Sequence, residues 1–84
     1  HGLRQLRFTA IRKGPIAHRL FVQQTAMRLG IRKKIGLYFS AFVSSPLTIG
    51  FIKPVILLPV ASFNQLTIAQ AEAVLLHELS HIRR

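Results

Sequence analysis

The sequence predicts an α+β fold: a small β-sheet flanked by helices, with a long amphipathic helix at the end of the chain. Two observations carry this prediction. Apolar and aromatic runs typical of strands occupy residues 35–58, and helical spacing of apolar residues occurs before them at 16–29 and after them from about 68 to 84. The chain has 84 residues, so it makes at most one small domain with a modest core.

The first 34 residues form a basic segment. Twelve Lys and Arg residues oppose two acids, for a formal net charge of +10, and most of the basic residues lie within 1–34. Residues 1–14 are expected to be a tether or an interfacial segment that ends at Gly14. Apolar residues then favour a helix over 16–29, with Gly30 as its natural stop. A charge concentrated in one half of the chain indicates an anionic partner, either nucleic acid or a membrane surface.

The middle of the chain predicts a sheet. The last β-rich run is bracketed by Pro54 and Pro59, and proline, which lacks an N–H, fits a strand end or an edge better than the middle of a sheet. The last two runs, separated by Gly50, predict a two-strand ribbon with an edge that another chain could pair with. The β-rich runs are 35–39 with 42–43, then 47–49, then 55–58.

The final helix has the clearest boundaries. Thr67 and Gln70 have the spacing of a capping box, in which each side chain satisfies a backbone N–H of the other residue. No Gly or Pro interrupts the chain after them, so a helix is predicted from about 68 to the end. It is expected to pack on the sheet through Ala71, Leu75, Leu79 and Ile82.

This helix carries the residues that indicate chemistry. His77 and His81 are four residues apart, so both imidazoles lie on one helix face within reach of one metal ion. Glu78 follows the first histidine, where a carboxylate can act as a base toward a metal-bound water without ligating the metal. The chain has no cysteine, so any zinc must be held by His and carboxylate. The alternative is an ordinary amphipathic helix with two polar histidines.

Two stretches of the sequence resemble a known family. They are Ser-Pro-Leu-Thr-Ile-Gly-Phe-Ile-Lys-Pro-Val-Ile-Leu-Leu-Pro at 45–59 and Leu-Thr-Ile-Ala-Gln-Ala-Glu-Ala-Val-Leu-Leu-His-Glu-Leu-Ser-His-Ile-Arg-Arg at 66–84. Together they closely resemble the BlaR/MecR antirepressor-type membrane zinc metallopeptidases. The resemblance covers about residues 35–84 and is looser over 1–34.

The resemblance implies a zincin-like domain of the gluzincin type, of which 35–84 would be the N-terminal part. It assigns zinc ligation to His77 and His81 and the general-base role to Glu78. The family's third protein ligand is a glutamate on a later helix, expected beyond Arg84. Glu72 cannot replace it, because five residues of helix turn it about 140° away from His77.

The family also suggests a biological setting. Its members are integral to the bacterial cell membrane, and their peptidase domain faces the cytoplasm and cleaves a protein substrate such as a transcriptional repressor in signal transduction. Residues 1–34 would then be a juxtamembrane segment. The strand residues Leu47, Thr48, Ile49 and Gly50 are candidates for holding the substrate by β-augmentation, unless they are simply core sheet.

The chain itself is expected to be a fragment of a longer protein. It begins with His1 and ends within a helix, and it lacks the third zinc ligand, so alone it is expected to be inactive. Its two uncharged stretches, 35–52 and 54–71, approach the length of a membrane span, but their Ser, Pro and Gly content argues against one.

The sequence leaves two alternative functions. A nucleic-acid-binding module would use Tyr38, Phe39 and Phe42 beside the basic run 32–34, but no nucleic-acid motif accompanies them, and no nucleic-acid partner is expected. A purely structural fragment without catalysis is the other alternative. His1 and His18 match no motif and are expected to be ordinary exposed residues.

Overall fold

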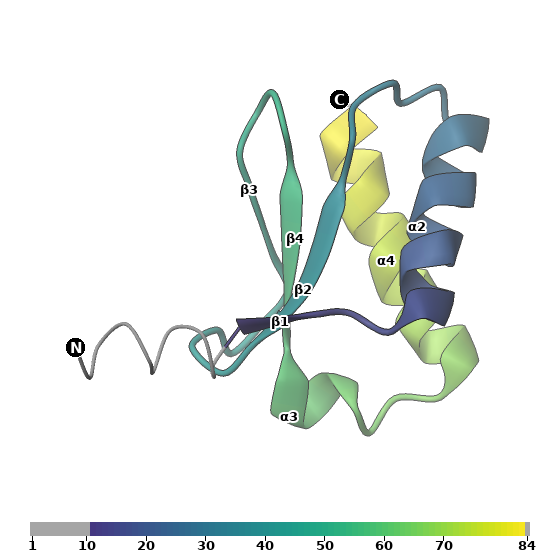
Figure 1. The fold of residues 1–84 in the computed structure, drawn as a ribbon. Helices are drawn as coiled ribbons and strands as arrows, with labels where there is room; N and C mark the ends of the chain where they lie inside the picture. Colours follow the sequence, from purple (N-terminus) through teal and green to yellow (C-terminus); the bar gives the residue numbers. More distant parts are fainter. Residues whose placement is uncertain (1–10, 84) are drawn as a thin grey trace.

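The computed structural model of the chain describes residues 11–83 and confirms the α+β class. Four strands form one mixed sheet in the order β1-β2-β4-β3 (Figure 1). β2 and β4 are parallel, whereas β1 pairs with β2 and β3 pairs with β4 in antiparallel fashion. The strands are β1 (Ile11–Lys13), β2 (Gly36–Ser40), β3 (Leu47–Ile49) and β4 (Val55–Pro59), and the helices are α2 (Ile16–Arg28), α3 (Val60–Phe63) and α4 (Ile68–Arg83).

The two long helices, α2 and α4, pack side by side against the same face of the sheet (Figure 1). The inner strands β2 and β4 therefore bury alternate residues toward the helices, as the period of two in a β-strand requires. The core is made of Leu37 and Phe39 from β2, Ile56 and Leu58 from β4, Val22 and Ala26 from α2, Ala71, Leu75 and Leu79 from α4, and Ile35 and Phe63.

Helix α2 ends at Arg28, one residue before the predicted end. Gly30 has φ of +77°, a conformation that residues with a Cβ rarely adopt. The N–H of Gly30 donates to the Met27 carbonyl, and the N–H of Ile31 donates to the Ala26 carbonyl. This pair of hydrogen bonds is a Schellman motif, which satisfies the last carbonyls of the helix and turns the chain toward β2.

Helix α4 begins as its sequence predicts. The backbone N–H of Thr67 donates to Gln70 Oε1 at 2.9 Å, and the N–H of Gln70 donates to Thr67 Oγ1 at 3.1 Å, which completes the capping box. The predicted packing face is also confirmed. Ala71, Leu75 and Leu79 are buried, and Ile82 is half-buried against the core.

Some elements differ from the sequence-based expectation. β2 ends at Ser40, and residues 42–43 lie outside it, because the N–H of Phe42 donates to Ser40 Oγ and a local side-chain bond of this kind turns the chain. β1 and α3 were not expected. All three residues of β1 are exposed, so no apolar pattern in the sequence predicts this strand. It forms through its pairing with β2.

The sequence predicted that Pro54 and Pro59 lie at a strand end or on an edge strand. Both lie at the ends of β4. Pro54 precedes the strand and Pro59 is its last residue. β4 itself is an inner strand between β2 and β3, so the open edge of the ribbon belongs to β3.

Residues 11–34 contribute β1 to the sheet, and Val22 and Ala26 of α2 to the same core as the later elements. The predicted domain boundary near residue 34 would therefore divide the chain by function, with a basic segment before it and a catalytic segment after it. This boundary stays a prediction. Residues 1–10, including His1 and most of the expected tether, lie outside the described residues. Within 11–83, no helix is both long and apolar enough to cross a bilayer.

The adjacent residues Leu75 and Leu76 allow a direct test of the fold. Leu75 is fully buried, whereas Leu76 is 46% exposed. We expect Leu75→Ala to lower the free energy of unfolding by about 2–5 kcal/mol, because it leaves a cavity between α4 and the sheet. Leu76→Ala, the matched control, should cost less than about 1 kcal/mol. Urea unfolding of both variants measures this, and equal losses would contradict the packing described.

Candidate metal centre

The two predicted metal ligands converge on the outer face of α4. Because Leu75 and Leu79 point into the core, His77 and His81 lie on the exposed side of the helix. Their Nε2 atoms are 3.0 Å apart, and the ring centroids are 4.5 Å apart with the planes nearly perpendicular. Both nitrogens therefore point at the same small volume at the protein surface.

This geometry fits a zinc ion. Two imidazole nitrogens that each lie about 2.0–2.1 Å from a tetrahedral zinc are about 3.3 Å apart, close to the observed separation. Two nitrogens this close need either a proton between them or a cation that both lone pairs can bind. Among residues 11–83 no third His, Asp or Glu joins them in a group that could hold a metal ion. This part of the chain thus supplies two imidazoles toward the site.

Glu78 lies beside the two histidines and is held by a strand. Thr48 Oγ1 donates a hydrogen bond of 2.8 Å to Glu78 Oε1. Thr48 is the middle residue of β3, so this bond joins the edge strand of the sheet to α4 across thirty residues of sequence. Glu78 is half-buried, and its second carboxylate oxygen, Oε2, is not engaged by this bond.

The four residues proposed from sequence to bind substrate lie on and just after β3, at the open edge of the sheet. Thr48 faces α4, whereas Leu47 and Ile49, which alternate with it, are about half exposed, at 46% and 49%. Gly50 has φ of +90°, and a Cβ there would lie 2.9 Å from the Lys53 carbonyl oxygen. Glycine is therefore required for the tight turn that leads from β3 into β4.

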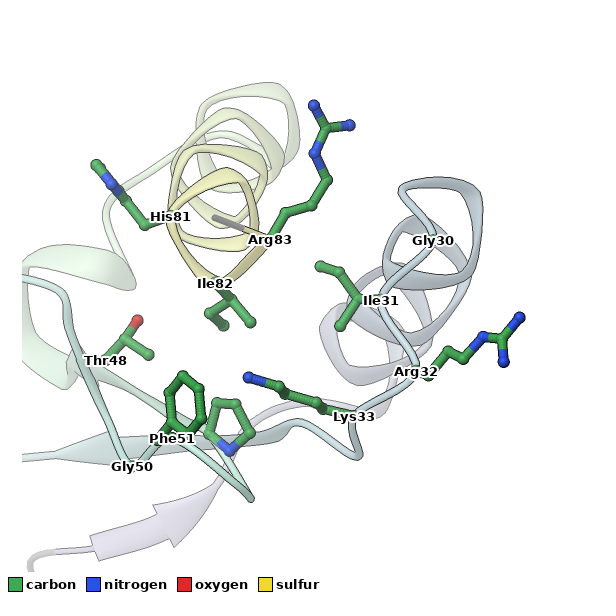
Figure 2. A pocket seen from close by; sticks show the side chains of 11 residues that line it. Gly30, Ile31, Arg32, Lys33, Thr48, Gly50, Phe51, His81, Ile82 and Arg83 are labelled. Atoms are coloured by element: carbon green, nitrogen blue, oxygen red, sulfur yellow. The ribbon is translucent and has the colours of Figure 1, made fainter.

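A groove of about 550 Å³ adjoins this centre. It lies between the C-terminal end of α4, the β3–β4 turn and the loop after α2 (Figure 2). His81 and Thr48 line it together with Lys33 and Phe51. The sequence marked Lys33 only as part of the basic run 32–34 and did not mark Phe51. Phe51 is 82% exposed although it is a large aromatic residue. The apolar turn around it is the one feature of the sequence that could have indicated a binding surface here.

His18 does not behave as expected. It was predicted to be an ordinary exposed residue, but it is half-buried on α2, and its ring packs edge-on against Phe63 with centroids 5.7 Å apart. The reason is that α3, which the sequence did not predict, places Phe63 against α2. His18 thus belongs to the packing of the helices and lies apart from His77 and His81.

Comparison with known proteins places the chain in a family. A family model described as BlaR1 peptidase M56 matches residues 4–84, which is nearly the whole chain and extends well before the 35–84 stretch on which the resemblance was recognised. No curated protein and no solved structure matches. The matched range includes β3, α4 and every residue of the candidate centre, and the chain therefore belongs to the BlaR1-type M56 peptidases.

Proposed function

We propose that this chain provides the first part of the active site of a zinc-dependent endopeptidase. The single observation that carries the proposal is the convergence of His77 Nε2 and His81 Nε2 at 3.0 Å beside a glutamate whose position is fixed by Thr48. Membership of a peptidase family supports hydrolysis of peptide bonds as the reaction.

Each residue has a separate task in this proposal. Zinc, when bound, would act as a Lewis acid and lower the pKa of a water molecule to about 7. His77 and His81 would hold the ion, and Glu78 would accept a proton from the attacking water and pass it to the leaving amine. Thr48 fixes the position of the Glu78 carboxylate, because its hydroxyl donates to Oε1 and leaves Oε2 for the proton. Thr48 is thus a positioning residue.

The free edge of β3 is the proposed site for the substrate backbone. A peptide that pairs with Leu47–Ile49 would add a fifth strand to the sheet and lie beside Glu78, since Thr48 joins the two. Main-chain pairing of this kind requires an extended segment of a protein or peptide. We infer a regulatory substrate, such as a transcriptional repressor, from the resemblance to antirepressor-type peptidases.

The basic residues support a position at the cytoplasmic side of a bacterial cell membrane. Positive charge is typical of segments that face the cytoplasm, and it attracts anionic lipid. The described part of the chain holds nine Lys and Arg residues against Glu72 and Glu78. Nucleic acid is a less favoured partner than the membrane. Phe39, one of the three aromatic residues that would stack on bases, is buried beneath the helices.

Zinc binding tests the metal centre. We expect the 84-residue chain to bind zinc weakly, because two imidazoles fall short of the three protein ligands of a catalytic zinc. Calorimetry should show that His77→Ala removes this binding and that Glu72→Gln, a change on the same helix, leaves it unchanged. Tight binding that survives His77→Ala would contradict the assignment.

Glu78 tests the mechanism in the intact protein that contains this chain. Gln can still accept the Thr48 hydroxyl bond but cannot act as a base, so Glu78→Gln should retain zinc while hydrolysis falls about 10²–10⁴-fold. His81→Ala should lose zinc and activity together. Zinc content and cleavage of protein substrate are measured side by side, with Glu72→Gln as control. Near-normal cleavage by the zinc-loaded Glu78→Gln protein would refute the mechanism.

Vesicle binding tests the membrane surface. We expect the chain to bind vesicles that contain phosphatidylglycerol and to dissociate as salt rises, because the screening length falls from about 10 Å at 0.1 M salt to about 3 Å at 1 M. Sedimentation with vesicles measures the bound fraction, and vesicles of phosphatidylcholine alone are the control. Equal binding to both kinds of vesicle at high salt would count against an electrostatic membrane contact.

A further inference from the structure

The groove beside the candidate centre holds a lysine in an unusual setting. Lys33 is half-buried, and its Nζ lies 4.0 Å from the centroid of the Phe51 ring. Figure 2 shows its side chain turned inward toward Phe51 and Ile82, whereas the side chains of Arg32 and Arg83 point away from the middle of the groove. The ammonium group therefore stands at the centre of a hollow with mainly apolar walls.

Among residues 11–83, no acidic side chain lines the groove. The sequence contains two acids, Glu72 and Glu78, and neither lines the groove. An aromatic ring attracts the Lys33 ammonium, but it occupies one side of a group that has three N–H donors. The remaining donors face space that an incoming group can fill. A carboxylate suits this position best, because it neutralises the charge and accepts the hydrogen bonds at once.

The groove is continuous with the proposed catalytic residues. Thr48, which holds Glu78, lies on its wall. His81, a proposed ligand, also lines it, although its ring is directed away from the middle of the groove (Figure 2). The turn that carries Phe51 follows directly from β3 through Gly50. A peptide that pairs with the edge of β3 can therefore place a side chain in the groove while its backbone lies next to Glu78.

We propose that Lys33 is a specificity-determining residue and that the groove binds an Asp or Glu side chain of the peptide substrate. This inference rests on the proposed peptidase function and names the substrate class of that same site. Once a peptide occupies the groove, the apolar side chains of Ile31, Phe51 and Ile82 would leave less water around the pair than at an open surface, which strengthens it relative to an exposed ion pair. Arg32 and Arg83 at the rim repel basic side chains from the entrance.

Cleavage of a mixed peptide library by the intact protein tests the preference. Products sequenced by mass spectrometry should show Glu or Asp enriched about tenfold at one position near the cut, the size expected for one hydrogen-bonded charge pair. Lys33→Gln should abolish the enrichment, Lys33→Arg should retain it, and Lys33→Glu should favour Lys or Arg there. Lys34→Gln is the matched control, because Lys34 is the next residue and lines a separate cavity.

A binding measurement separates this inference from the peptidase function. The zinc-loaded Glu78→Gln protein is titrated with fluorescent peptide pairs that differ by a single Glu or Gln, and the same pairs are repeated with Lys33→Gln added. Cleavage without acidic preference would overturn the groove assignment and leave the peptidase standing. If binding is acid-selective and depends on Lys33, but the protein that retains Glu78 cleaves no peptide, the groove assignment is supported and the peptidase function is refuted. Circular dichroism confirms that each variant is folded.

Discussion

Burial of the apolar stripe of α4 against the sheet is the constraint on which the rest of the structure depends. Leu75 and Leu79, one helical turn apart, are both fully buried and fix the rotation of the helix about its axis. Once this rotation is fixed, His77 and His81 must lie on the opposite side, facing solvent. Glu78 falls at the border between the two faces, where it is half-buried and reaches the edge strand. The position of the candidate centre is thus a consequence of packing.

β3 links three features that a peptidase site would need. Its outer edge is free for a peptide backbone, its middle residue Thr48 holds Glu78, and its end at Gly50 turns the chain so that Phe51 forms a wall of the groove. All three rest on a strand of three residues, which is stabilised on one side only, by its pairing with β4. A change in the register of this strand would therefore disturb the base and both proposed substrate contacts together.

The charge distribution gives the basic residues two different settings. Both acids of the sequence lie on α4, so the cations of the α2 region have few partners within the chain. Lys33 is drawn inward by an aromatic ring, whereas Arg32 and Arg83 remain at the surface (Figure 2). The family match begins at residue 4, so the basic segment is part of the same family unit as α4, which carries His77, Glu78 and His81. The net charge alone does not reveal this difference between one inward cation and the outward ones.

The sequence by itself determined the α+β class, both long helices, the strand pair around Gly50 and the spacing of His77, Glu78 and His81. These features follow from local signals, namely a capping box, a left-handed glycine, proline at strand ends and helical periodicity. Only the tertiary structure decided the rest. It paired the short, exposed β1 with β2, placed α3 and hence Phe63 against His18, and joined Thr48 to Glu78. It also turned Lys33 over Phe51. Each of these contacts joins residues that are distant in sequence, and no pattern within one segment records which distant segment it will meet.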